Sequence, residues 1–283
     1  MARMPFNISK LAGAWKEVSA GASQPASIVL AGDARLVGLA QERLASGGTM
    51  PATWVRPVAD LSGLASVPGE LLVLLVTPSA EAEVLAALGD PAPRGGAIIA
   101  VDEGAAASGD TSRPCRRCTR LSFSDTPGGW KRLFEVTAEA AGEHVVALGR
   151  RYPVLRQAAA ERVVGRTSAQ NALVGVAFFM PGSDMPVMTL NQVKMALSVA
   201  NLYGLGIDRE RAVEVAGILG LGFGLRALAR YLQRALPGIG LVVKAAVGYL
   251  GTMALGRLAI RYFERGAPAS TSRVVALAGK LRR

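Results

Sequence analysis

Short, uninterrupted apolar runs alternate with helix-like stretches in the first half of the chain. The runs SIVLAG, ELLVLLVT and GGAIIAVD begin at Ser27, Glu70 and Gly95, and a glycine, proline or aspartate bounds each one. Segments such as ARLVGLAQERLA lie between them and repeat apolar residues at helical spacing. This alternation is typical of a parallel sheet that is buried on both faces. It predicts a small doubly wound α/β domain over 25–150, completed by a strand in TRLSFSD and one long helix over 129–152.

Strand-like runs are absent from the sequence after Pro153, and helical patterns replace them. Proline and glycine in MPGSDMP, GLGID and LPGIG separate the expected helices. These helices are predicted over residues 154–179, 186–203, 208–234 and 237–265. The sequence therefore indicates an α/β domain followed by an all-α domain over 151–266, with a basic, mobile tail over 267–283.

A separate helix is expected in residues 1–24. Ile8, Leu11, Trp15 and Val18 recur on one stripe of such a helix. This stripe fits either docking on the body of the protein or contact with a membrane surface. The N-terminus has no apolar core of a signal peptide, so we expect a protein of the cytoplasm or of the cytoplasmic side of the inner membrane.

The apolar stretches of the second half do not form an ideal membrane span. The fully apolar part of 169–181 is shorter than the roughly 20 residues that a spanning helix needs. Residues 235–256 are long enough only if Lys244 is tolerated near the middle. Gly248, Thr252 and Gly256 form a small-residue face that allows close helix packing. Two interpretations remain open: a glycine-rich helical hairpin associated with membrane, and a soluble all-α domain.

The net charge of +11 is concentrated in the second half of the chain. Residues 1–130 hold 11 Lys and Arg against 12 Asp and Glu, whereas residues 131–283 hold 21 against 9. This asymmetry indicates an anionic partner such as lipid headgroups, nucleic acid or an acidic protein, although an arginine-rich surface from genome bias gives the same pattern. Aromatic residues alternate with basic ones only in ARYLQR and IRYFER, which argues against nucleic acid. The candidate membrane contacts in this half are Arg230, Arg234, Lys244, Arg257 and Arg261.

The turn after the first strand does not carry a phosphate-binding loop. Such a loop needs G-x-x-x-x-G-K-[ST], because its lysine reaches the phosphates and its hydroxyl binds magnesium. The next glycine after Gly32 is Gly38, one place late, and no lysine or hydroxyl follows it. Ordinary binding of nucleoside triphosphate is therefore not expected, and Gly32, Asp33 and Asp102 remain candidates only for an unconventional nucleotide site.

The string RRYPVLRQAAAERVVGRTSAQNALVGVAFFMPGSDMPVMTLNQVKMALSVANLYG resembles the YcjF-like helical domain of unknown function that follows Era-like small GTPases in many bacteria. GFGLRALARYLQRALPGIG and VGYLGTMALGRLAIRYFE continue the resemblance, which covers roughly residues 150–265. The resemblance implies a helical, often membrane-associated module of undefined activity, paired with a GTPase or GTPase-like domain.

The resemblance extends to the order of elements in the α/β half, but not to its motifs. It implies that GGAIIAVD should end in Asn-Lys-x-Asp, and only Asp102 matches, because Ile99 and Ala100 stand at the Asn and Lys positions. No switch threonine or Asp-x-x-Gly is evident between Gly38 and Glu70. We therefore interpret residues 25–150 as a degenerate GTPase-like domain without nucleotide or other cofactor.

The remaining chemistry-bearing residues are few. Cys115 and Cys118 form a C-x-x-C, but zinc needs four ligands and His144 is the only histidine. Two cysteines imply no disulfide framework, and a reducing compartment is expected. A single histidine also argues against a hydrolase with a base beside its nucleophile. The arginines around the cysteine pair form a candidate anion-binding loop, for example for lipid phosphate: Arg113, Arg116, Arg117 and Arg120.

Polar residues also interrupt the helical half. Asp184 precedes the helix expected at 186, where it could cap free amides or form a polar tip that contacts a partner. Asn191, Gln192 and Lys194 lie among apolar residues and are expected to form interhelical hydrogen bonds. A buried Lys194 or Lys244 would need Asp184 or Glu214 as a partner.

Three functions are compatible with these features. The first is a non-catalytic, membrane-associated scaffold or partner-binding protein. The second is a soluble interaction module that oligomerises through its helical half. The third is a GTP-binding protein or GTPase with an unconventional loop at Gly32 and Asp33. Contact with membrane lipid and with a protein partner, or self-association, is expected; metal ions and cofactors are not.

Overall fold

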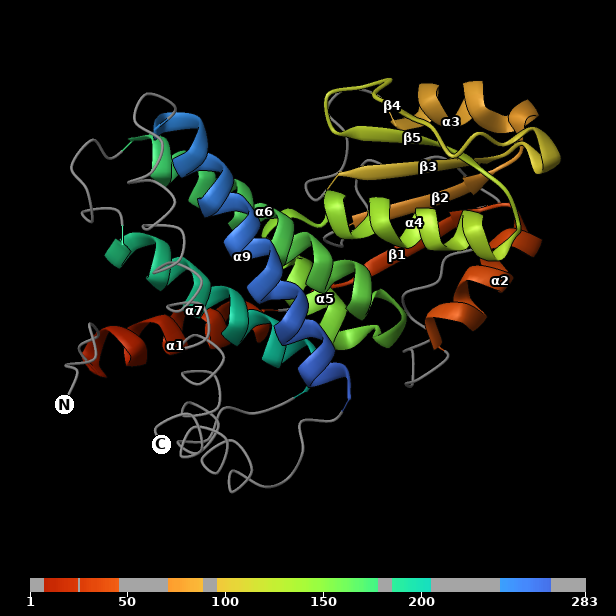
Figure 1. Ribbon diagram of the computed structural model, residues 1–283. Helices are drawn as coiled ribbons and strands as arrows, with labels where there is room; N and C mark the ends of the chain where they lie inside the picture. Colours follow the sequence, from red (N-terminus) through yellow and green to blue (C-terminus); the bar gives the residue numbers. More distant parts are fainter. Residues whose placement is uncertain are drawn as a thin grey trace. The chain divides into compact units, whose positions relative to one another are not determined.

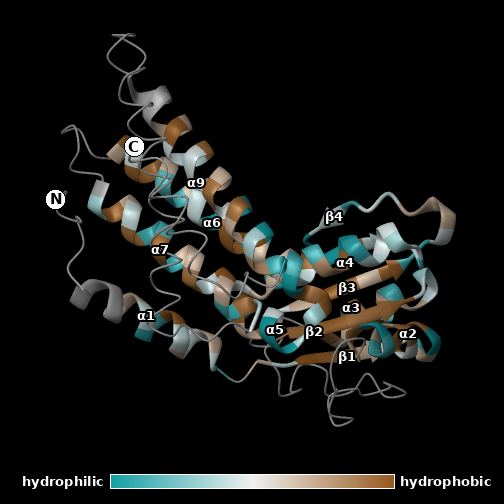
Figure 2. Ribbon diagram, turned by 60° about the horizontal axis from the view of Figure 1, so that its bottom comes forward, coloured by the Kyte–Doolittle hydropathy of each residue, from teal (hydrophilic) through white to brown (hydrophobic). Residues whose placement is uncertain are grey.

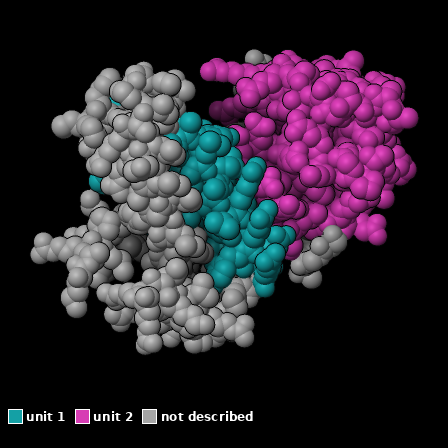
Figure 3. All heavy atoms as spheres, viewed as in Figure 1, with its two compact units in different colours: residues 1–22, 163–283 teal, residues 23–162 magenta. Residues whose placement is uncertain are grey.

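The computed structural model describes residues 8–24, 26–45, 71–88, 96–177, 185–204 and 240–265. It divides into two compact units (Figure 3). Residues 23–162 form one, here called the α/β unit; residues 1–22 and 163–283 form the other, called the helical unit.

The α/β unit is built on one mostly parallel sheet, as the apolar runs predicted. Its strands are β1 (Ile28–Gly32), β2 (Leu71–Val76), β3 (Ala97–Asp102), β4 (Thr111–Ser112) and β5 (Cys118–Phe123). They follow the order β1-β2-β3-β5-β4, and only the short edge strand β4 is antiparallel to its neighbour (Figure 1). Figure 2 shows that β1, β2 and β3 are hydrophobic along their lengths, whereas hydrophobic and hydrophilic residues alternate along the helices. A strand buried on both faces has no polar side to alternate with.

Helices cover both faces of the sheet. Helices α2 (Ala34–Ala45) and α4 (Pro127–Ala140) pack over one face, and α3 (Glu81–Leu88) packs over the other. Alternation along the strands sorts the side chains, so that Leu72 and Leu74 face α3 while Val73 faces α2 and α4. The four parallel strands β1, β2, β3 and β5 follow chain order across the sheet, so their order shows no reversal of the kind that opens a ligand crevice in a doubly wound fold.

The prediction of a single helix over 129–152 is wrong. Helix α4 ends at Ala140, and α5 (Val145–Arg151) begins after a 3-10 turn over Gly142–His144. Gly142 adopts φ +56°, a left-handed conformation that ends a helix and that glycine tolerates without strain. A second 3-10 turn, Pro153–Leu155, follows α5.

The helical unit contains α1 (Ile8–Ala22), α7 (Met185–Leu202), α9 (Gly240–Glu264) and the part of α6 (Arg156–Ala177) that begins at Val163. Helix α7 packs against both α1 and α9. The N-terminal helix therefore docks on its own unit, one of the two arrangements expected for it. The helix expected over 208–234 and the tail lie outside the described residues.

The division between units differs from the boundaries expected at 24/25 and 150/151. Helix α1 joins the helical unit because it packs on α7, and the chain stays with the α/β unit as far as Arg162. Buried Tyr152 helps hold this later segment on the α/β unit, since its hydroxyl accepts a hydrogen bond from the Ile28 amide at 3.4 Å. Arg151 also donates to the Ala26 carbonyl oxygen at 3.1 Å.

Glycines bring two helices of the helical unit into close contact. A Cβ placed on Gly248 would lie 2.6 Å from the carbonyl oxygen of Asn171, and one on Gly256 would lie 2.4 Å from a methyl carbon of Val164. The small-residue face predicted on α9 is thus the face that packs on α6. Across the described part of the chain, no helix is both long enough and apolar enough to cross a bilayer.

Candidate functional site

Three aspartates gather at the carboxyl edge of the sheet, the edge at which α/β proteins bind ligands. Asp33 follows β1, Asp102 ends β3, and Asp125 follows β5. Arg35, in the first turn of α2, reaches two of them, with Nη2 at 3.1 Å from Asp102 Oδ2 and Nη1 at 3.2 Å from Asp125 Oδ2. The Trp130 indole donates to Asp125 Oδ1 at 2.7 Å. A cation of the chain itself therefore occupies the position between these carboxylates.

Asp33 caps the helix that follows it. Its Oδ1 accepts hydrogen bonds from the amides of Arg35 at 3.0 Å and Leu36 at 3.1 Å. The preceding Gly32 has φ +120°, and a Cβ there would lie 2.0 Å from the Leu75 carbonyl oxygen. One residue thus connects β1 to α2. Amides at a helix N-terminus are the groups that bind phosphate elsewhere, and here two of them are engaged by a carboxylate.

Of the sequence candidates at this edge, Gly32 and Asp33 lie at the end of β1 and Asp102 at the end of β3, with β2 between them, and Arg35 was not predicted. The phosphate-loop motif has no arginine at this position, so the motif does not predict Arg35. The signal was the D-x-R spacing directly after a buried strand, which places a cation in the first turn of the helix.

The four arginines expected to form one anion-binding loop separate into two groups. Arg113, Arg116 and Arg117 are exposed in the connection between β4 and β5, which we call the arginine loop (residues 113–117). The side chain of Arg120 is only 26% exposed, and it bridges Glu81 and Glu103 with N–O distances of 2.6 Å to each. The two carboxylates neutralise its charge.

Hydrogen bonding shifts the pKa of two groups in the Arg120 bridge. Ser122 donates to Glu103 at 2.5 Å, and this bond, followed by that from Arg120, lowers the pKa of the Glu103 carboxyl. The bonds to Glu81 and then Glu103 raise the pKa of Arg120. The bridge links the first turn of α3 to β5, so we interpret it as a contact that stabilises the fold.

The cysteine pair departs from the sequence-based expectation. Cys115 and Cys118 are joined by a disulfide, although two cysteines implied no disulfide framework. The turn that leads into β5 brings their Cα atoms to 5.0 Å, within the range that a disulfide spans.

A buried polar cluster joins α6, α7 and α9. The Thr252 hydroxyl accepts from Asn171 Nδ2 and from Gln192 Nε2, both at 2.9 Å. Asn191 Nδ2 donates to Asn171 Oδ1 at 2.9 Å. The interhelical hydrogen bonds expected for Asn191 and Gln192 are present. Asn171 was missed, although an asparagine within an uncharged, mainly apolar stretch was a visible signal.

Lys194 has a different partner from those expected. Its Nζ lies 2.6 Å from Glu17 Oε2 on α1, and the lysine side chain is one-third exposed. Asp184 and Glu214, the partners considered from sequence, lie outside the described residues.

One face of α9 is exposed, apolar and basic. Leu250 is 63% exposed and Leu258 is 47% exposed, and exposed Ala254 lies between them. Arg257 and Arg261 share this face, because spacings of four, seven, eight and eleven residues return to one side of a helix. We call these five residues the α9 stripe. Arg230, Arg234 and the side chain of Lys244 lie outside the described part of the chain.

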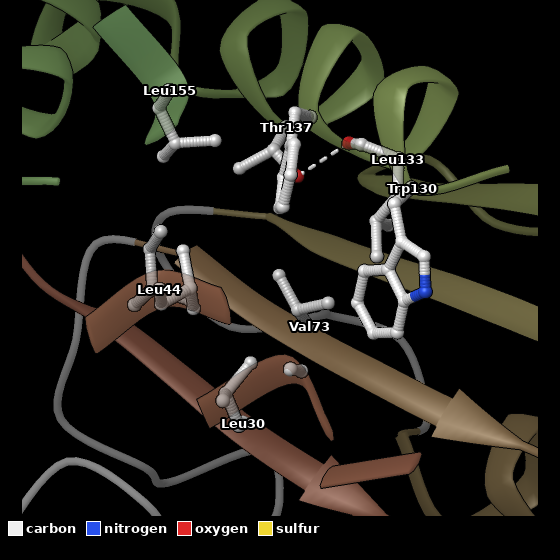
Figure 4. A pocket seen from close by; sticks show the side chains of 10 residues that line it. Leu30, Leu44, Val73, Trp130, Leu133, Thr137 and Leu155 are labelled. Carbon is white, nitrogen blue, oxygen red and sulfur yellow. Dashed lines mark hydrogen bonds between the residues drawn. The ribbon is translucent and has the colours of Figure 1, made fainter. Parts of the chain in front are cut away.

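A small pocket in the α/β unit lies between the sheet and helices α2 and α4 (Figure 4). Leu30, Leu44 and Val73 line it together with Trp130. The hydroxyl of Thr137 donates to the carbonyl oxygen of Leu133 at 2.7 Å instead of facing a ligand. A ligand pocket combines apolar walls with convergent polar groups, so we interpret this pocket as a packing gap.

Within the described residues, no group of three or more His, Cys, Asp or Glu side chains is arranged to hold a metal ion. Searches with the chain found no matching protein-family model, no matching curated protein and no matching solved structure.

Proposed function

We propose that this protein is a non-catalytic, membrane-associated scaffold whose helical unit contacts anionic lipid and whose α/β unit binds a protein partner. The observation that carries the proposal is the α9 stripe. Exposed leucines beside arginines on one helical face are typical of helices that lie at a membrane surface. The leucines would leave water for the acyl boundary, and each arginine would gain about 1 kcal/mol near an anionic surface. The cytoplasmic leaflet of the inner membrane is the anionic surface proposed.

The non-catalytic part of the proposal rests on the carboxyl edge of the sheet. A bound nucleotide would have to displace Arg35 from Asp102 and place its phosphates beside the Asp33 carboxylate. Like charges repel, and the amides that would offset this repulsion already bind Asp33. We extend the proposal to a degenerate GTPase-like α/β domain followed by a YcjF-like helical domain. The support for that kinship is the sequence resemblance, together with the mostly parallel sheet followed by helices.

Vesicle co-sedimentation of the full chain tests the lipid contact. We expect binding to vesicles that contain phosphatidylserine and a loss of at least about tenfold in Leu250→Asp/Leu258→Asp, because transferring each leucine is worth about 1.5–3 kcal/mol. Gly38→Asp introduces one acidic side chain at an exposed helical position of the α/β unit and should bind as the wild type does. Equal binding by the double variant, or no binding by the wild type, would refute the proposal.

The charge contribution has its own matched pair. Arg257→Glu should weaken binding to phosphatidylserine vesicles and reduce its dependence on salt, whereas Arg150→Glu makes the same charge change on α5 and should not. If both variants weaken binding equally, the attraction is a property of net charge and not of the stripe. If the stripe variants instead change the mass of a monodisperse oligomer without affecting vesicles, the surface serves self-association.

Calorimetry with GTP, GDP and ATP tests the absence of nucleotide binding. We expect no saturable heat with any of the three. Saturable binding that Asp33→Ala abolishes would replace the scaffold proposal with an unconventional nucleotide-binding protein.

A further inference from the structure

The two sulfur atoms of the disulfide lie in different surroundings. Cys118 is the first residue of β5, only 2% exposed, and belongs to the apolar core beneath α3. Cys115 lies three residues earlier in the arginine loop and is partly exposed. A reagent in solution therefore has better access to the sulfur of Cys115 than to that of Cys118.

The sheet does not depend on this cross-link. Backbone hydrogen bonds already fix the start of β5, since the Ala97 amide donates to the Arg117 carbonyl oxygen at 2.9 Å and the parallel ladder continues from Cys118. A disulfide stabilises a fold mainly by closing a long loop in the unfolded chain, and a separation of three residues closes a very short one. Loss of the bond should thus leave the α/β unit folded.

The loop that carries Cys115 is rich in arginine. Residues 111–119 include three arginines and no acidic residue. Arg113 and Arg116 are exposed, and each lies within two residues of Cys115. An anionic thiol would be attracted to this loop, whereas a neutral thiol would not.

We propose that Cys115 and Cys118 form a reversible thiol–disulfide exchange site for small anionic thiols of the glutathione class, with Cys115 as the sulfur that forms the mixed disulfide. In the reduced protein, the Cys115 thiolate attacks one sulfur of glutathione disulfide. A mixed disulfide between Cys115 and glutathione forms, the S–S bond of glutathione disulfide breaks, and the other glutathione leaves as a thiolate and takes up a proton. The Cys118 thiol then loses its proton and attacks Cys115, and the second glutathione leaves as a thiol. Two electrons pass from the protein dithiol to glutathione disulfide, and the reverse sequence reduces the protein.

The exchange would act on the arginine loop. The disulfide fastens Cys115, within the loop, to the first residue of β5. Its reduction frees the Cys115 side chain and leaves only the 3.3 Å hydrogen bond from the Cys118 amide to the Cys115 carbonyl oxygen, while the β3–β5 ladder holds Cys118 in place. The site thereby couples the redox state of the thiol pool to the conformation of the arginine loop around Cys115. Exchange through a mixed disulfide needs a sulfur that the attacking thiol can reach, and Cys115 is the more accessible of the two.

A redox titration of the full chain in mixtures of reduced and oxidised glutathione tests reversibility. Maleimide labelling after acid quenching counts the thiols, and circular dichroism follows the fold. We expect a complete, reversible two-electron transition with unchanged circular dichroism. A disulfide that resists glutathione until the protein is unfolded, or a dithiol that does not oxidise in glutathione disulfide, would overturn the proposal.

Single-cysteine variants test which sulfur reacts. Cys118→Ser keeps Cys115 and should react with glutathione disulfide at least about tenfold faster than Cys115→Ser, whose buried Cys118 needs a local opening of the strand. Urea-unfolded samples should show similar rates and serve as the control. Equal rates in the folded protein would contradict the assignment.

A third experiment tests whether the arginines favour an anionic thiol over a neutral one. Arg113→Gln/Arg116→Gln should slow reduction of the wild-type disulfide by glutathione several-fold and leave reduction by neutral 2-mercaptoethanol unchanged. An equal effect on both thiols would mean that the arginines do not select an anionic partner.

Discussion

The hydroxyl of Thr252 is the acceptor on which the packing of α6, α7 and α9 depends. It is fully buried and accepts hydrogen bonds from Asn171 and Gln192, both at 2.9 Å. Thr252→Val keeps the shape of the side chain but leaves two buried amide donors without this acceptor. Each buried donor left unsatisfied costs about 1–3 kcal/mol, so the variant should lose about 2–6 kcal/mol of helical-unit stability. Thr252→Ser keeps both bonds and removes one methyl group, which should cost about 1 kcal/mol.

Native-state hydrogen exchange read by peptide mass spectrometry is the appropriate assay, because the two units need not unfold together. Peptides from α7 and α9 should exchange faster in Thr252→Val than in Thr252→Ser, while peptides from β3 and β5 should be unchanged. Adding Gln192→Leu to the valine variant removes one stranded donor and should restore part of the loss. If valine costs no more than serine, the cluster does not stabilise the unit and the reasoning fails.

Three further outcomes are expected. Gly32→Ala should destabilise the α/β unit by about 2 kcal/mol or more, because it combines a left-handed backbone with a clash against β2; Gly38→Ala, in open space on α2, should be neutral or stabilising, and urea unfolding compares the two. Gly256→Ala should destabilise the helical unit by about 1–3 kcal/mol through overpacking, which faster hydrogen exchange in α9 peptides would report. Gly251→Ala lies on the same helix with no neighbour within 4 Å, so exchange in that variant should be unchanged. Glu103 has a pKa below its ordinary value of 4.5, so its contribution to stability is fully present above pH 4.5 and is lost as the pH falls through the lowered pKa. In Glu103→Gln the urea midpoint should fall less steeply in that acid range, and an unchanged slope would show that the carboxylate is not stabilised by folding.

Local pattern was enough for the strands and for several helices. Uninterrupted apolar runs predicted β1, β2 and β3, because a strand buried on both faces has no polar alternation to obscure it. The break at Gly142 was missed, because a lone glycine within an amphipathic stretch does not by itself end a helix.

The candidate site could be predicted only in part, because its chemistry depends on pairs that are distant along the chain. Arg35 and Asp102 are separated by 67 positions, and Arg120 and Glu81 by 39. From sequence each was a charged residue with an unknown partner. The fold decided that Arg35 lies among aspartates and that Arg120 is neutralised, while the other loop arginines stay exposed.

The sequence by itself determined what depends on nearest neighbours: the lack of a phosphate-loop motif after the first strand, the apolar strands, and the small-residue face of α9. Only the tertiary structure decided which polar side chains meet, which face of α9 remains in water, and that Cys115 and Cys118 differ in access. The physical reason is that burial and charge pairing are properties of surroundings. Residues far apart in the chain create those surroundings, and only folding brings them together.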